Sequence, residues 1–596
     1  MNKFIIMLVV VSGLFISCND DFLERYPIVE ISDGGFWKTA TDLKLYVNSF
    51  YNNTEFFPRY TAWFSTGIYS LDADNGSDTY IPITYVRRMN GENTVPASHS
   101  NGEGWAVGDW GNLRSLNYFM DNYKKSTEPW DVTKTYVGEV LFLRGLFYYN
   151  QLRRFGDLPF VSTALQTDSK VLFEARLPRN QVVDSIMHDM DLAVEYLPAR
   201  TAAWTGRITK ETAMLLQARI ALYEGTWEKY HALKNTPFKA AGSDGSKFIR
   251  KAAEVSGALM ALAESNGNTA LANVGQENGY FDLFNLKDYS TNKEVMLWRK
   301  YSVADGSTHL WLRYTWCGAQ RGLTKSMIDS YLCTDGKPIS ESPLYKGDAD
   351  LKSVVANRDP RLNQTIYVDD GKHFEWKQQN TFFKTPKFDG PNEEKCITGY
   401  QLYKGHSGDR DDFNASTSGL IYFRYAEALL IYAEARTELG EITQSDVDKT
   451  INALRRRVGM TEGLLNISSI TADPNWEFEG ISPILQEVRR ERKVELACEG
   501  FRVDDIFRWA AADKLIKGVI PKGAVWEQWR DYPGASAAFT TAWTALTVDD
   551  EGYIYPYKAT SALSSGFNFN LERDYLLPIP SNEITLNLAL KQNPGW

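Results

Sequence analysis

The chain of 596 residues is poor in the features that would place it in several common protein classes. It has only five cysteines and six histidines, and no two cysteines form a C-x-x-C pair, so neither a zinc site nor a redox motif is indicated. No apolar run approaches the roughly 20 residues that a membrane-spanning helix needs. The net charge of −10 argues against nucleic acid as a charge-driven partner.

Motifs of catalysis are missing as well. The chain contains no G-x-S-x-G elbow, no H-E-x-x-H pair and no phosphate-binding loop. Asp72, Asp74 and Asp78 surround Gly76, but a calcium loop would need a late carboxylate where Ile83 stands. We therefore expect no catalytic residue, no metal and no cofactor. The 75 acidic residues leave a glycosidase carboxylate pair open by count, although no pair stands out by its context.

The first residues of the chain have the pattern of a secretory signal peptide. A short basic segment, Met1 to Lys3, precedes the uncharged run 4–16, and Ser17 and Cys18 follow that run. This ending resembles a bacterial lipobox, so we expect a signal peptide over residues 1–17 and a lipid on Cys18. Several acyl chains would make the anchor nearly permanent, since each buried methylene contributes about 0.8 kcal/mol. A secreted protein with a buried Cys18 is the alternative.

Two acidic residues, Asp20 and Asp21, follow Cys18. They resemble the export signal of surface lipoproteins in the Bacteroidetes, although a solvated tether would have the same composition. The four other cysteines stand far apart, and we expect buried free thiols, with pairing left open. They are Cys317, Cys333, Cys396 and Cys498.

Apolar residues recur at helical spacing in several segments of the chain. Helices are predicted from Val137 to Phe155, near 180–197, from about Lys210 to Tyr223 with an end at Gly225, and from Phe248 onward. The second half repeats this pattern, with helices predicted over 422–439, 445–458 and 481–499. We therefore predict a mostly α fold with tetratricopeptide-like helix pairs, although the strict 34-residue signature is absent.

Five segments carry a resemblance to a known family. They are "LRGLFYYNQLRRFGDLPFV", "GRITKETAMLLQARIALYEG", "FRYAEALLIYAEA", "RRERKVELACEGFRVDDIFRW" and "YLLPIPSNEITLNLALKQNPGW". Together with the lipobox, in this order and over nearly the whole mature chain, they resemble the SusD/RagB family. The resemblance implies a nutrient-binding lipoprotein of the Bacteroidetes outer membrane that faces the cell surface. It also implies a partner, a SusC-like TonB-dependent transporter, and a non-catalytic role in oligosaccharide capture.

We expect a helical half over residues 18–265 and a loop-rich half over 266–596. Aromatic residues make up 13% of the chain and gather in Gly-rich segments of both halves. The charged segment Arg489–Trp509 could form an anion-binding patch. The simpler interpretation, which we adopt, is that its side chains pair along a helix at i,i+3 or i,i+4.

The segment "STHLWLRYTWCGAQRG" contains the first group of candidate ligand residues. A flat ring can cover the C–H face of a sugar, and about 100 Å² of covered apolar area contributes roughly 2.5 kcal/mol. Trp311, Tyr314 and Trp316 are the candidate rings, and Arg313 and Gln320 are candidate hydrogen-bond donors. Burial of these rings in the core is the alternative.

The early segment 80–110 supplies a second group. Tyr80, Tyr85 and Trp105 are candidate exposed rings, and Asn101 could bond hydroxyl groups. We therefore expect oligosaccharide binding and no nucleic-acid partner. The family resemblance implies that the protein sits as a lid over its transporter. Peptide binding by this lid mechanism, a surface glycoside hydrolase, and a scaffold that binds only protein remain alternatives.

Overall fold

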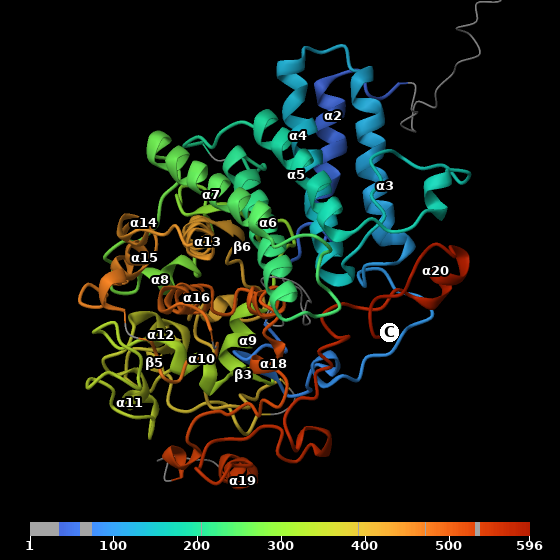
Figure 1. The fold of residues 1–596 in the computed structure, drawn as a ribbon. Coiled ribbons are helices and arrows are strands. Elements are labelled where there is room, and N and C mark those ends of the chain that lie inside the picture. Colours follow the sequence, from blue (N-terminus) through green and yellow to red (C-terminus); the bar gives the residue numbers. More distant parts are fainter. Residues whose placement is uncertain are drawn as a thin grey trace, which may run out of the picture.

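The computed structural model describes residues 35–59, 74–203, 205–390, 393–470, 472–478, 480–530 and 537–596. The expected signal peptide and Cys18 lie outside these residues. Helices dominate, as predicted (Figure 1). The longer ones are α2 (Ala40–Asn48), α3 (Val107–Asn122), α4 (Trp130–Phe155), α5 (Arg179–Tyr196), α6 (Lys210–Leu233), α7 (Ser246–Asn266), α13 (Tyr425–Glu438), α16 (Pro483–Glu495) and α19 (Ala537–Ala545). None of the described helices is both long enough and apolar enough to span a bilayer.

Shorter elements fill the second half. The short helices are α8 (Gly279–Leu283), α9 (Trp311–Cys317), α10 (Lys325–Ser330), α11 (Leu351–Val355), α12 (Pro360–Thr365), α14 (Gln444–Lys449), α15 (Ile451–Arg457), α17 (Arg502–Arg508), α18 (Ala512–Leu515) and α20 (Ser581–Leu586). The strands form antiparallel pairs. These pairs are β1 (Tyr80–Pro82) with β3 (Arg321–Leu323), β2 (Val295–Arg299) with β6 (Leu420–Arg424), and β4 (Phe374–Trp376) with β5 (Thr381–Phe382).

Helix α6 differs from its prediction at one end. The sequence predicted an end at Gly225, but the helix continues to Leu233. A Cβ atom at Gly225 would lie 2.6 Å from the backbone nitrogen of Ile249, at the start of α7. Gly225 therefore permits the close approach of two helices rather than ending one.

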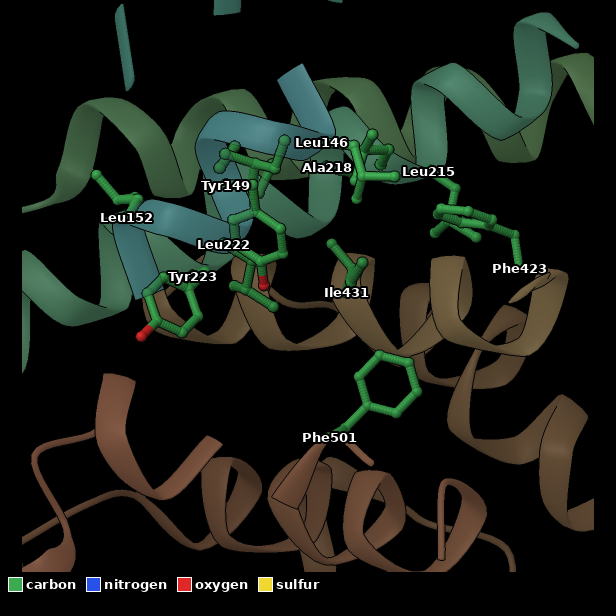
Figure 2. Packing of buried hydrophobic residues seen from close by; sticks show 14 of the residues in the cluster. Leu146, Tyr149, Leu152, Leu215, Ala218, Leu222, Tyr223, Phe423, Ile431 and Phe501 are labelled. Carbon is green, nitrogen blue, oxygen red and sulfur yellow. The ribbon is translucent and has the colours of Figure 1, made fainter. Parts of the chain in front are cut away.

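The long helices form a continuous scaffold in which neighbours in the chain pack on one another. Helix α4 contacts α5, α5 contacts α6, and α6 contacts α7, while α13 from the second half packs on α7 and α16. Figure 2 shows Leu146 of α4, Leu215 of α6 and Ile431 of α13 turned toward a common interior. Each such buried side chain contributes about 1.5–3 kcal/mol. The two halves therefore share one core.

Helix α16 carries its charges inside this core, and the pairing predicted along the helix is wrong for most of them. Arg490 and Glu487 keep the i,i+3 spacing at 3.0 Å. Glu495, however, lies 2.6 Å from both Arg424 and Arg457, which belong to other elements. A buried charge needs an oppositely charged group beside it, and for Glu495 these groups come from other segments of the chain.

Burial alone would raise the pKa of the Glu495 carboxyl, but the surrounding guanidinium groups of Arg457 and Arg424 lower it well below its ordinary value. These charged groups are buried, so they serve the interior of the fold and not an exposed anion-binding patch.

A second apolar cluster holds the loop-rich half together. It includes Tyr314, Tyr331 and Leu362, all buried. Strand β1 from the first half pairs with β3 here, and the Ile83 N–H donates to the carbonyl of Gln320 at 2.8 Å. The two segments predicted to carry ligand residues therefore meet along the backbone. Cys317, Cys333, Cys396 and Cys498 are unpaired, which confirms free thiols at these positions; the first three are buried as expected, whereas Cys498 is half-buried.

Candidate functional site

Three aromatic side chains come together beside helix α9. The ring of Trp316 lies 5.6 Å from that of Trp376 at an angle of 34°, and each lies 5.4 Å from the ring of Phe413 in an edge-to-face arrangement. All three residues are half-buried, so each keeps part of its surface exposed to solvent. We call this group the aromatic platform. Its residues come from α9, β4 and the loop after the short 3-10 helix Arg410–Asp412.

A buried histidine fixes the two tryptophans. His406 Nε2 donates to the carbonyl of Glu375 at 3.0 Å, and Nδ1 accepts from the hydroxyl of Thr315 at 3.0 Å. Thr315 and Glu375 directly precede Trp316 and Trp376. Burial lowers the pKa of His406 to about 3, which favours the neutral ring that this pattern requires.

Helix α9 is also held at both of its ends. The backbone N–H of Trp311 donates to His309 Nδ1 at 3.2 Å, and His309 Nε2 donates to the carbonyl of Ser418 at 2.9 Å. At the other end, the amide of Gln401 donates to the carbonyl of Trp316 at 2.7 Å. A short helix gains little stability from its own hydrogen bonds, so these tertiary contacts position the platform.

Charged side chains surround the three rings. Lys387 Nζ lies 4.6 Å from the ring centre of Trp316 and 3.0 Å from a carboxylate oxygen of Glu375. Arg313 lies 5.5 Å over Phe413 and pairs with Glu393, while the exposed Arg410 lies 5.9 Å from Trp376. We call these charged side chains the rim of the platform. The rim offers hydrogen-bond donors and acceptors beside the apolar faces of the rings.

The backbone after α9 is unusual. Gly318, Ala319 and Gln320 have φ angles of 78°, 49° and 60°, so three consecutive residues adopt left-handed conformations. Only glycine adopts a positive φ angle without a cost in free energy. Strained residues of this kind are found where packing or a functional site holds the backbone in place. The turn directs the chain from the platform into β3.

One sequence comparison identifies the chain. The sequence model described as the SusD family matches residues 286–596, just over half of the chain. The protein belongs to the SusD family. A second model, described as "Starch-binding associating with outer membrane", matches residues 110–222. These matches confirm the resemblance noted in the sequence.

Known relatives share the whole length of this SusD-family chain. SusD-like protein P2 from Formosa agariphila is 23% identical over 610 aligned positions and covers 100% of both chains. The crystal structure of a SusD-like carbohydrate binding protein from Bacteroides fragilis superposes with a TM-score of 0.69 at 21% identity, over 93% of this chain and 100% of that one. A laminarin binding SusD-like protein gives a TM-score of 0.52 at 18% identity, over 94% and 100%. These structural likenesses show the fold.

The candidate residues of α9 are divided between the platform and the interior of this SusD fold. Trp316 and Arg313 belong to the platform and its rim. Tyr314 is buried in the second apolar cluster, so its ring offers no exposed face. Trp311 is half-buried against Gly405, where a Cβ atom would lie 2.4 Å from the indole nitrogen. Gln320 lies in the strained turn.

The early segment lies mostly elsewhere. Tyr80 and Trp105 are buried, so the expectation of exposed rings is wrong for both, because each faces an apolar cluster. Tyr85 is half-buried and its hydroxyl donates to Glu92 at 2.8 Å. The side-chain oxygen of Asn101 accepts from the N–H of Gly108, in the first turn of α3, at 3.2 Å. Their roles in ligand binding stay predictions.

Sequence reasoning missed two members of the platform, Trp376 and Phe413. The segment "HFEWKQQN", residues 373–380, places aromatic residues among polar ones, as residues 307–322 do, and it could have been chosen on that ground. Phe413 stands among polar residues with no distinguishing pattern. Among the described residues, no group of three His, Cys, Asp or Glu side chains is arranged to hold a metal ion.

Proposed function

We propose that this SusD-family protein binds an oligosaccharide at the aromatic platform. The observation that carries the proposal is the meeting of Trp316, Trp376 and Phe413 as half-buried rings within a charged rim. The C–H face of a pyranose can lie on an indole, and its hydroxyl groups can bond Lys387, Arg410 and the paired carboxylates. Structural relatives described as a carbohydrate binding protein and a laminarin binding protein support the same ligand class.

The expected affinity is modest. Covering about 100 Å² of apolar surface on each indole contributes roughly 2.5 kcal/mol before the cost of association is subtracted. Two rings therefore favour a weak, multi-residue contact with a glycan chain. Such an affinity suits a protein that releases its ligand to a partner.

The experiment is a soluble-glycan screen followed by calorimetry. The double variant Trp316→Ala, Trp376→Ala should lose binding, with each single change weakening it about tenfold, equivalent to about 1.4 kcal/mol. Trp130→Ala, which removes an exposed indole at the start of α4, is the matched control and should bind as wild type does. Wild-type affinity in the double variant would exclude the platform as the binding site.

We further propose that the protein is anchored through Cys18 to the outer membrane, faces outward and delivers its ligand to a SusC-like TonB-dependent transporter. The lipobox and the family description of outer-membrane association support this. Cys18→Ala should release the protein from the membrane fraction. External protease should degrade the wild type on intact cells, and a transporter should co-purify with it. Protection from protease in intact cells would contradict outward exposure.

The role is proposed to be non-catalytic. Glu375 and Glu393, two carboxylates beside the platform, pair with Lys387 and Arg313. A hydrogen bond from its own backbone and the Arg313 guanidinium lower the pKa of Glu393, the opposite of what a general acid requires. Incubation with the bound glycan should produce no new reducing ends; their steady release would favour a hydrolase. Peptide binding without glycan binding would favour peptide import.

A further inference from the structure

A cavity of about 530 Å³ lies away from the platform, between helix α3, the segment 159–174 and helix α20. Figure 1 shows α3 and α20 on the same side of the molecule. The Asn587 amide donates to the carbonyls of Leu172 and Glu174 at 3.2 and 3.0 Å, so it ties the end of α20 to the opposite wall. The volume falls within the 300–1,000 Å³ range of small-molecule sites.

The walls of the cavity are mainly apolar. Trp105 and Leu113 form its buried side, and Trp110 packs edge-to-face on Trp105 at 5.4 Å. Apolar side chains also stand open to solvent around it: Val107 is 93% exposed, Leu586 72% and Phe173 61%. Scattered exposed apolar residues are ordinary, but a group that lines one cavity marks a binding site.

Polar side chains form the smaller part of the lining and restrict the head group of a ligand. They are Arg114, Asn117, Thr163, Gln166, Thr167, Glu174, Glu583 and Asn587. The indole N–H of Trp110 is buried and has no hydrogen-bond partner among the described residues. Glu174 and Glu583 line the cavity, and Arg114 is the cation in its lining. Two carboxylates against one guanidinium disfavour an anion, whereas an ether or hydroxyl oxygen would supply the acceptor that Trp110 lacks.

We propose that this cavity binds the alkyl chain of an amphiphile with an uncharged head. The chain would lie between Trp105, Trp110 and Phe173, and a head-group oxygen would accept from the Trp110 N–H. An alkyl chain matches the mainly apolar walls better than a free oligosaccharide does, because hydroxyl groups placed against those walls would lose their partners. The site is therefore distinct from the platform in position and in ligand chemistry.

Gly111 provides a precise test. It lines the cavity, and a Cβ atom added there would have no atom within 4 Å. Gly111→Leu should therefore place a bulky side chain at the cavity wall without disturbing α3, and the change favours helix formation. Gly111→Ala is the matched control, because it makes the same change in helix propensity but occupies little of the cavity.

The probe is N-phenyl-1-naphthylamine, an uncharged fluorophore, added to full-length chain that carries Cys18→Ala and is purified without detergent. Saturable binding is expected, with competition by octyl glucoside below its micelle concentration, weaker competition by octanoate, and none by glucose. Gly111→Leu should weaken probe binding at least about tenfold, and Gly111→Ala should leave it within about twofold.

Phe173→Ser is a second, independent variant that should also weaken binding, whereas Val303→Ser, an exposed apolar residue outside the cavity, should not. Phosphatidylcholine vesicles distinguish two possible sources of the bound alkyl chain. If the protein is retained on the vesicles and Phe173→Ser reduces that retention, the bound alkyl chain belongs to a bilayer lipid. If amphiphiles compete only in solution, the alkyl chain belongs to a free amphiphile. Unchanged probe binding in both Gly111→Leu and Phe173→Ser would overturn the proposal, whatever the platform binds.

Discussion

His406 joins Thr315 to Glu375 through two hydrogen bonds of 3.0 Å each. One buried ring thereby sets the spacing of the two residues that follow, Trp316 and Trp376. The platform thus depends on a residue that lies behind it and, in the proposed mode, touches no ligand.

His406→Ala should weaken glycan binding about tenfold without removing a platform ring, because the two indoles lose their common support. His406→Gln should restore much of the affinity, since its amide can donate to Glu375 and accept from Thr315. Calorimetry measures the affinity, and near-ultraviolet circular dichroism reports the indole environment. Equal loss in both variants would indicate a general folding defect instead.

Acid should destabilise the protein through its buried histidines. Burial lowers the pKa of His231 to about 3, and its ring bonds Thr236 at 2.6 Å and the carbonyl of Phe507 at 3.0 Å. Below about pH 6.5, His231 is protonated in the unfolded chain but stays neutral in the native protein. The free energy of unfolding therefore falls as the pH falls toward 3. The slope is at most about 1.4 kcal/mol per pH unit for this group.

Urea unfolding of wild type and His231→Gln between pH 7 and pH 4.5 checks this prediction. The variant loses packing against Trp227 at every pH, but the difference between the two proteins should shrink as the pH falls. A constant difference would contradict the assigned neutral state of His231.

Glu228 should act in the opposite direction. Its side chain is fully buried, accepts from Ser243 and lies near Glu224; burial, and then the charge of Glu224, raise its pKa to about 8. Between about pH 4.5 and 8 the native state keeps a proton that the unfolded chain has lost, so this group costs stability as the pH rises. Glu228→Gln should therefore gain stability relative to wild type from pH 5 to 8. Urea unfolding at several pH values measures the stability of both proteins, and a difference in stability that stays constant from pH 5 to 8 would refute the prediction.

Gly225 and Gly111 form a natural pair for comparing helix propensity with packing. Gly111→Ala should stabilise by up to about 1 kcal/mol, because α3 gains a better helix former in open space. Gly225→Ala should destabilise by at least about 1–3 kcal/mol, because its methyl group would meet the backbone of Ile249 and push α7 away from α6. Thermal and urea unfolding of both variants measure the difference, and stabilisation by both would contradict the close packing.

The sequence was a good guide to the scaffold and a partial guide to the site. Both ends of α5, the end of α4 and the start of α7 were predicted closely, because apolar periodicity is a local property. The prediction for α4 began at Val137, whereas the helix begins at Trp130, and no end was predicted for α7. The prediction over 445–458 missed the break at Thr450 between α14 and α15. At the site, the aromatic composition of residues 307–322 pointed to Trp316, but could not separate it from the buried Tyr314 two positions earlier.

The sequence by itself determined that this is a helical, aromatic-rich chain of the SusD kind, since periodicity, ordered motifs and composition all lie along the chain. Only the tertiary structure decided which rings face solvent, that Trp376 and Phe413 join Trp316, and that the charges of α16 pair with distant segments. The physical reason is the same in each case. Exposure, ring contacts and ion pairing depend on neighbours in space, and Trp316 is separated from its partners by loops without a repeating pattern.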